Sequence, residues 1–460
     1  MSARFQSEFA NTTTLHPVGG VALAICAAMV FVLPRRLLLL PFLALLLLIP
    51  ASQRVAIGGL DFDLIRILVV CAMGRVLIKN EWKGLRFCGM DGLVLAATAV
   101  AVTIPLVRTM STGPLIYLLG RAYDAVLLYG VLRVALQSRA DLLMAARVMA
   151  VMSVPVCCAF ALEWMTRYNI FSVFGGVKAI TWIRDGRLRC QGPYAHPITA
   201  GVVWVGMLPM IASLIWLDAK RWWLGTVGAF CSLGIVYFCA SSTPVFGAMV
   251  ALGAGSLYKF RKYAVPAFWG SVAVLVVLHF VMKAPVWHLV SRVSAVGGST
   301  GWHRYHLIDQ AVNRIPEWFV MGTHGTAHWG RQLFDVTNHF IAMAVTGGIL
   351  SLGLLVATLW VGMQWARQRA IAWEVSDPGG SKLAWALWTS MVAHSWMFIG
   401  VSYFGQAAFV LTMHLAAIAG LHLMRGAATA EADATTRSTP ARRRPMYLQT
   451  RLRGQRGVTA

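Results

Sequence analysis

The chain has 460 residues, of which 58% are hydrophobic and 12% are charged. A soluble domain cannot bury so much apolar surface, whereas a lipid bilayer solvates it, so the composition excludes an ordinary soluble protein. The formal net charge is +23. Its placement argues against nucleic-acid binding, because the basic residues lie in short loops between apolar segments and in the C-terminal tail.

Thirteen apolar segments follow one another along the chain and are predicted to be membrane-crossing helices. They lie near residues 18–33, 36–50, 60–78, 91–108, 113–135, 142–163, 198–217, 222–239, 243–258, 264–282, 338–365, 382–400 and 405–424. A straight crossing needs roughly 20 residues, and the first two segments are shorter than this. The sequence therefore predicts an all-α, polytopic transmembrane bundle of 12 or 13 spans over residues 1–424.

The loops between these segments alternate in charge. Every second loop is basic; these loops carry Arg35 and Arg36, Lys79 to Arg86, Arg139, Lys220 and Arg221, Lys259 to Lys262, and Arg367 with Arg369. Such loops are retained in the cytoplasm, so they are predicted to face it together with the C-terminus. Residues 425–460 lack hydrophobic periodicity and are predicted to form a basic, disordered cytoplasmic tail. The N-terminus lies outside with thirteen spans and inside with twelve.

Two long polar loops, 164–197 and 283–336, fall on the predicted outer side, where basic residues are normally scarce. The first contains Arg184, Arg187 and Arg189, followed by glycine and proline residues that break a helix. The sequence thus predicts a basic cluster on irregular backbone beside the start of a span.

The second outer loop has a helical part and a turn-rich part. Apolar residues recur at helical spacing over 302–315, which predicts an amphipathic helix on the membrane surface. His324 follows in a turn between Gly322 and Gly325, and the glycine spacing of this segment matches neither a Walker loop nor the pattern GxGxxG. The sequence contains no metal-ligand pattern, and Cys190, an exposed cysteine by position, has no partner for a disulfide in its outer loop.

The arginines and histidines of these loops point to a phosphorylated substrate. Guanidinium groups bind phosphate oxygens in pairs and stay charged at any working pH, so several arginines suit a diphosphate. A histidine near its ordinary pKa of about 6.5 can take a proton from an attacking hydroxyl. Placed together at the membrane surface, these groups would suit glycosyl transfer from a lipid diphosphate.

The order of short motifs between about residues 185 and 360 carries a resemblance. The motifs are Arg189-x-x-Gly192 with Pro197 before a span, Ser241-Ser242 at the end of another, Gly301-x-x-Arg304, Gly322-x-x-Gly325, Asn338-His339-Phe340 and the glycine-rich stretch Gly347 to Gly353. In this order they resemble the O-antigen ligase and O-antigen or exopolysaccharide polymerase family of polytopic bacterial glycosyltransferases. Members often have histidine followed by asparagine, whereas here the asparagine comes first.

The resemblance implies an inner-membrane enzyme with its active site facing the periplasm. Its donor would be a glycan on undecaprenyl diphosphate, and its acceptor a sugar hydroxyl on lipid A-core or on a growing polysaccharide. It would invert the anomeric centre without a metal or another cofactor. His339, Arg304 and Arg189 carry over as catalytic residues. The expected substrate-binding residues are Arg187, Asn338, His324 and Ser242.

Other interpretations of the same residues stay open. His339 could cap its helix, and the arginines could bind lipid headgroups instead of a substrate. A second class of function is a transporter or flippase of an anionic lipid or polysaccharide precursor, and a third is a scaffold for an envelope complex. Arg121 and Asp124, three residues apart on one predicted span, are expected to form an ion pair.

Overall fold

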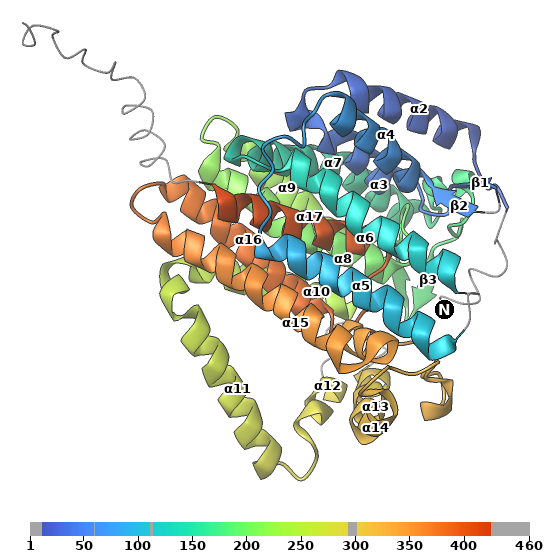
Figure 1. Ribbon diagram of the computed structural model, residues 1–460, viewed down its shortest axis with the longest axis vertical. Helices are drawn as coiled ribbons and strands as arrows, with labels where there is room; N and C mark the ends of the chain where they lie inside the picture. Colours follow the sequence, from blue (N-terminus) through green and yellow to red (C-terminus); the bar gives the residue numbers. More distant parts are fainter. Residues whose placement is uncertain (1–11, 59, 111–113, 293–300, 425–460) are drawn as a thin grey trace, which may run out of the picture.

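The computed structural model describes residues 12–58, 60–110, 114–292 and 301–424 (Figure 1). Each of the thirteen predicted segments contains a helix there, although the segment 60–78 begins with a short strand. The helices are α2 (Pro17–Val32), α3 (Leu39–Leu48), α4 (Leu64–Ile78), α5 (Gly89–Thr109), α6 (Leu115–Ala135), α7 (Arg139–Thr166), α8 (Pro197–Leu217), α9 (Trp222–Phe238), α10 (Ser242–Ser256), α11 (Ala264–Val281), α15 (His339–Ala372), α16 (Pro378–Met397) and α17 (Gly405–Leu423). The predicted tail, 425–460, lies outside the described residues.

Helix length limits how many of these segments can cross a bilayer alone. Within the described part of the chain, seven helical stretches are long and apolar enough to do so, namely Gly89–Thr109, Leu115–Ala135, Arg139–Thr166, Pro197–Leu217, Ser242–Val281, His339–Ala372 and Gly405–Leu423. The ten residues of α3 rise only about 15 Å along the helix axis. The structure thus confirms an all-α bundle with apolar helices of spanning length. The number of 12 or 13 spans remains a prediction.

Local sequence signals set several helix starts. Ser138 and Asp141 form a reciprocal capping box at the start of α7. His196 caps α8, and Asp377 caps α16, in each case just before a proline at the first helical position. Proline is favoured there because its missing N–H would have no helical partner.

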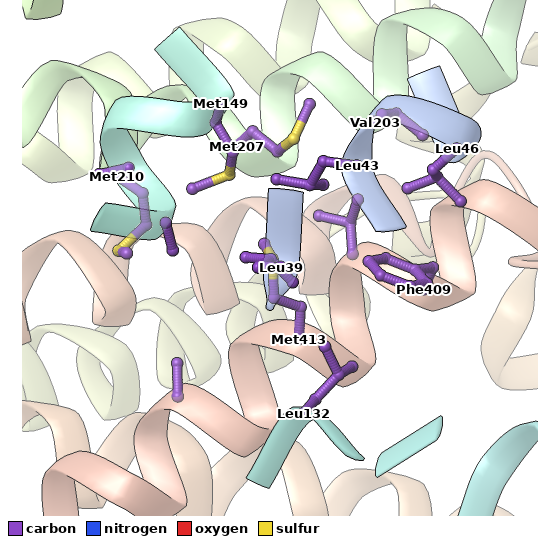
Figure 2. Packing of buried hydrophobic residues seen from close by; sticks show 14 of the residues in the cluster. Leu39, Leu43, Leu46, Leu132, Met149, Val203, Met207, Met210, Phe409 and Met413 are labelled. Atoms are coloured by element: carbon purple, nitrogen blue, oxygen red, sulfur yellow. The ribbon is translucent and has the colours of Figure 1, made fainter. Parts of the chain in front are cut away.

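The core of the bundle is built around α8. Its side chains are almost all buried, and it packs against α9, α10 and α16. Leu39, Leu43 and Leu46 of α3 share one buried cluster with Val203 and Met207 of α8 (Figure 2). Phe409 and Met413 of α17 complete that layer. The helix too short to span alone is therefore held inside the protein by apolar contacts.

Helix α11 stands away from this core (Figure 1). None of its residues is buried, and Val277 and Phe280 are 60% and 81% exposed. Its beginning touches the bundle, where Phe268 and Trp269 contact the ring of Trp360 on α15. An apolar helix exposed on all sides fits a lipid environment, because every backbone hydrogen bond is satisfied within the helix itself.

Charged residues on the helices are mostly paired, but not as the sequence spacing suggested. Asp124 accepts two hydrogen bonds from Arg66 of α4, at 2.7 and 2.6 Å, and no ion pair between Arg121 and Asp124 forms in the described residues. The prediction of an Arg121–Asp124 pair is therefore wrong. The Arg66 guanidinium spans both carboxylate oxygens, which makes it the better partner.

Both long polar loops contain helices or strands in their described residues. The first contains a hairpin of β3 (Trp182–Arg184) and β4 (Arg187–Arg189), in which Trp182 pairs with Arg189. The expectation of irregular backbone is thus wrong for this stretch, whose Asp185-Gly186 turn has positive φ at both residues. Cys190 is buried rather than exposed, and its backbone N–H donates to the Phe238 carbonyl at the end of α9 at 3.0 Å. A second hairpin, β1 (Arg54–Ile57) with β2 (Leu60–Asp63), lies near the N-terminus.

The second loop contains the expected surface helix as α13 (Gly301–Asn313), preceded by α12 (Leu289–Arg292) and followed by α14 (Ile315–Trp318). One face of α13 is buried: Leu307 and Ala311 form a small apolar cluster with Trp318, Trp329 and Ala344. Because Ala344 belongs to α15, the apolar face of α13 packs the second loop against the first turns of α15.

Candidate functional site

Arg304 is a buried cation at the beginning of α13. It is 9% exposed, and its Nη2 donates a hydrogen bond of 2.7 Å to Oγ1 of Thr243 on α10. Its Nε has no hydrogen-bond partner among the described residues. Burial, reinforced by the charge of Arg184, lowers the pKa of Arg304 to about 10. The side chain thus remains charged at neutral pH, with hydrogen-bonding capacity unused.

Arg189 is a second buried cation, at the end of β4. It is 5% exposed, and its Nε likewise lacks a partner in the described part of the chain. Burial lowers the pKa of Arg189, and the charge of Arg184 lowers it further. Burial also lowers the pKa of His196 to about 4, with the charges of Arg189 and Arg184 acting in the same direction. His196 is therefore neutral at pH 7.

These electrostatic effects place three guanidinium groups in one region. The charge of Arg184 acts on Arg189 and on Arg304. Arg184 itself forms a salt bridge of 3.5 Å with Asp185. Neither Arg189 nor Arg304 has a carboxylate within salt-bridge distance among the residues described. A buried cation without a counter-ion is costly, so a bound anion would stabilise this region.

Two residues that the sequence did not single out fix the backbone after Arg189. Glu163 of α7 accepts hydrogen bonds from the backbone N–H of Gln191, at 3.1 Å, and of Gly192, at 2.9 Å. The Asn169 amide donates to the Gly192 carbonyl at 2.8 Å. At Gly192 φ is +55°, and a Cβ would lie 2.3 Å from the Phe160 ring. The glycine of the Arg-x-x-Gly motif is thus required for packing.

His339 is the first residue of α15, and Asn338 is its N-cap. The Asn338 side chain accepts a hydrogen bond of 3.1 Å from the backbone N–H of Ile341, and its amide donates to the Ile399 carbonyl at 3.3 Å. Asn338 and not His339 therefore caps the helix, which overturns the capping interpretation of the histidine. The order Asn-His has a structural reason, because asparagine is among the best N-cap residues.

The His339 ring is held on several sides. Its backbone N–H donates to the Phe398 carbonyl at 2.8 Å, and its Nδ1 accepts from the backbone N–H of Tyr403 at 3.2 Å. The rings of Phe398 and Tyr403 lie 4.4 and 5.8 Å from the imidazole centroid. Arg121 of α6 is close enough for its charge to act on the imidazole. His339 as a whole residue is 9% exposed, so only a small part of it can meet a substrate.

The segment 398–403, between α16 and α17, joins Arg304 to His339. Tyr403 and Phe398 contact His339, and Ile399 contacts Asn338. A Cβ on Gly400 would lie 2.6 Å from Thr243 Oγ1 and 3.2 Å from Arg304 Nε. Arg304 and His339 therefore pack against the same short segment. Its sequence offers no signal of this role except a glycine between two helices.

The glycines of the remaining motifs attach the second loop to α15. The helix is broken at Gly347 and Gly348, and φ of Gly348 is +65°. At the break, Thr323 N–H donates to the Val345 carbonyl at 2.8 Å, and Ile349 N–H donates to Phe319 at 2.7 Å. Arg108 of α5 donates to the carbonyls of Met321, Val345 and Thr346. The glycine-rich stretch that begins at Gly347 therefore holds the second loop against α15 through backbone contacts.

The predicted substrate-binding residues differ in their positions. Asn338 lies at the site as the cap of α15, whereas Arg187 and His324 are exposed. No described contact joins either of the exposed residues to Arg304 or His339. Thr243, the neighbour of Ser242, carries the hydrogen bond to Arg304. The binding roles of Arg187, His324 and Ser242 remain predictions.

The described side chains hold no group of three or more histidine, cysteine, aspartate or glutamate residues that could bind a metal ion. The described site combines buried arginines with one histidine at the ends of apolar helices. No protein-family model and no curated protein sequence matches this chain.

Proposed function

We propose that this protein is a membrane glycosyltransferase of the O-antigen ligase or polysaccharide polymerase kind. It would transfer a glycan from undecaprenyl diphosphate to a sugar hydroxyl at the periplasmic face of the bacterial inner membrane. The observation that carries the proposal is the pair of buried arginines, Arg189 and Arg304, which lack acidic partners in the described residues. A lipid diphosphate would supply the missing negative charge.

The arginines would bind the diphosphate and stabilise it as it leaves. Negative charge on the leaving group grows as the bond to the sugar breaks, so donors aimed at it bind the transition state more strongly than the ground state. Removing one such donor typically costs about 3 kcal/mol of transition-state stabilisation. Arg304 suits this role because its pKa of about 10 keeps it charged at neutral pH.

His339 would deprotonate or orient the acceptor hydroxyl for attack on the anomeric carbon. It shares segment 398–403 with Arg304, so a sugar diphosphate bound by the arginine would have its reacting carbon near the imidazole. Attack from the side opposite the departing diphosphate inverts the anomeric centre. The acceptor would be lipid A-core or a growing polysaccharide, and the reaction would need no metal ion.

A transporter or flippase would need charged groups along a path through the bundle. Two other buried arginines are instead neutralised at helix ends: Arg133, in the last turn of α6, pairs with Asp91 at 2.8 Å, and Arg75, in the last turn of α4, pairs with Glu81 at 2.7 Å. The buried arginines without counter-ions gather at one end of the helices. This distribution favours chemistry on one face of the membrane over transport across it.

The test is a transfer assay with purified protein in lipid vesicles, a labelled undecaprenyl-diphosphate glycan and no added metal. Lipid A-core and the free repeat unit are supplied in parallel as acceptors. The wild type should form product, whereas Arg304→Ala should lose it. Arg331→Ala is the matched control, because Arg331 is an exposed arginine of the same loop. Product on lipid A-core identifies a ligase, and product on the repeat unit a polymerase. Glycan lipid that crosses the bilayer unchanged would instead indicate a flippase.

A further inference from the structure

The hydrogen bonds around His339 determine which of its nitrogens can carry a proton. A backbone N–H can only donate, so the bond of 3.2 Å from Tyr403 requires a lone pair on His339 Nδ1. A neutral imidazole with an acceptor at Nδ1 carries its proton on Nε2. The opposite tautomer would place two N–H groups against each other. The Tyr403 amide thus selects the Nε2–H form.

A buried chain of hydrogen bonds holds that amide in place. The Tyr403 hydroxyl lies 2.8 Å from Nδ1 of His394, and Nε2 of His394 lies 3.0 Å from Nδ1 of His414. His394 and His414 are fully buried, and Tyr403 is 8% exposed. This chain joins α16 to α17, and its Tyr403 ring lies 5.8 Å from the His339 ring. It therefore anchors the segment from which the Tyr403 N–H donates.

The other nitrogen of His339 is available to a ligand. Nε2 has no hydrogen-bond partner among the described residues, and it is not one of their fully enclosed polar atoms. Phe398 and Tyr403 restrict the ring on its sides, so rotation that would exchange the two nitrogens is hindered. The part of the imidazole that a substrate can meet is thus a hydrogen-bond donor.

We infer that His339 acts as a fixed Nε2–H donor to a diphosphate oxygen, and this role replaces the deprotonation or orientation of the acceptor hydroxyl in the proposed mechanism. The inference rests on the proposed function and assigns His339 to the leaving-group side of the site, with Arg189 and Arg304. His394, His414 and Tyr403 are positioning residues that maintain this tautomer.

The transfer step then balances without a protein base. The acceptor oxygen forms a bond to the anomeric carbon while the bond from that carbon to the phosphate oxygen breaks, and its electron pair passes to the diphosphate. The hydroxyl proton passes to solvent water on the acceptor side, because the departing diphosphate lies on the opposite face of the sugar. His339 keeps its own proton throughout and donates a hydrogen bond that strengthens as charge builds on the leaving group.

Two substitutions at position 339 distinguish a donor from a base. Glutamine places an N–H₂ group close to the position of Nε2 but has no basic nitrogen, whereas glutamate offers a basic oxygen but no donor. We expect His339→Gln to retain transfer within about tenfold of wild type. His339→Glu and His339→Ala should lose about 10²–10³-fold, the usual effect of removing one such donor. An active His339→Glu, or a His339→Gln as inactive as the alanine variant, would overturn the inference.

A spectroscopic measurement tests the tautomer independently of transfer. Protein labelled with ¹⁵N-histidine is studied in lipid by solid-state NMR at pH 7, and the His339 signals are identified by difference from His339→Gln. We expect a neutral ring with its proton on Nε2, whose Nε2–H signal shifts when inorganic diphosphate is added. A proton on Nδ1, or a signal unchanged by diphosphate, refutes the inference. If the wild type makes no product, the proposed function fails, and this measurement still decides the role of the ring as an anion donor.

The positioning role is tested at Tyr403. Tyr403→Phe removes the hydroxyl that bonds to His394 but leaves the backbone N–H in place. We expect kcat to fall by about tenfold with little change in KM, together with a broadened His339 NMR signal. Tyr258→Phe is the control, because it removes a comparable inter-helix hydrogen bond of 2.8 Å, to Ser381, remote from the site. Equal spectra and kinetics for both variants would exclude Tyr403 as a positioning residue.

Discussion

The surroundings of Arg304 suit a residue that binds an anion. Its guanidinium is buried, yet Thr243 is its only hydrogen-bond partner among the described residues. Burying a cation in this way lowers its pKa and destabilises the empty protein. Such an arrangement persists when the residue is needed for binding, and an anionic ligand would remove the penalty.

Replacing Arg304 with lysine tests whether the planar guanidinium is needed. Lysine keeps the charge. Its single ammonium group, however, cannot bind Thr243 and at the same time present a parallel N–H donor to a diphosphate. We expect Arg304→Lys to lower transfer by about 10²-fold with unchanged expression and folding. The readout is the initial rate in the vesicle assay, beside Arg331→Lys as the control. Wild-type activity in the variant would remove Arg304 from the site.

Gly400 tests whether the shared segment positions the arginine. A methyl group there would lie 2.6 Å from Thr243 Oγ1 and 3.2 Å from Arg304 Nε, so one of them must move. We expect Gly400→Ala to reduce transfer at least tenfold while the protein stays folded, because misplacing a catalytic group is costly. Gly253→Ala is the control, since nothing lies within 4 Å of a Cβ there. Equal activity of the two variants would show that the segment does not set the position of Arg304.

The lowered pKa of His196 predicts that the protein loses stability in acid. Its pKa in the folded protein is about 4, below the ordinary value of 6.5, so between these pH values the unfolded chain binds more protons. The free energy of unfolding must then fall as the pH drops from 6.5 to 4. Asparagine can keep the helix cap without titrating, so His196→Asn should weaken this acid dependence. Thermal unfolding of both proteins at pH 7 and 5 measures it; equal losses would contradict the shifted pKa.

At the scale of elements, the sequence predicted helices well and long-range contacts poorly. Every apolar segment became a helix, and the pattern at 302–315 located α13, because both signals depend on neighbours within a few turns. Segment 398–403 was not predicted as part of the site. Its contacts join residues about 60 positions apart, such as Tyr403 and His339, and no local pattern encodes them. The Asp185-Gly186 turn was a local signal for the β3–β4 hairpin that the helix-based interpretation passed over.

The break in α15 gives a prediction at this scale. Gly348 has φ of +65°, and a Cβ would lie 2.3 Å from the Val320 carbonyl oxygen. Gly348→Ala should therefore detach the second loop from α15, which hydrogen exchange would detect as faster exchange over residues 315–330. Gly353→Ala is the matched control in the same helix, with open space around its Cβ. Unchanged exchange in Gly348→Ala would mean that the loop is held by other contacts.

At the scale of the whole molecule, the positions of the two arginine-rich loops follow from how the helices are connected. Arg189 precedes α8, Arg304 lies between α11 and α15, and both reach the same end of the bundle. Basic loops such as the one around Lys220 follow the opposite ends of these helices. The proposed function requires the arginine end to face the periplasm, where lipid-linked glycans would be used.

Cysteine labelling tests this orientation. Arg331 and Lys220 are both exposed, the first in the loop seated on α15 and the second between α8 and α9. We expect Arg331→Cys to react with a membrane-impermeant maleimide in cells with a permeabilised outer membrane. Lys220→Cys should react only after the inner membrane is opened, because basic loops stay in the cytoplasm. The unsubstituted protein measures the background from the native cysteines. The reverse pattern would place Arg189, Arg304 and His339 on the cytoplasmic side, where a periplasmic transfer reaction cannot occur.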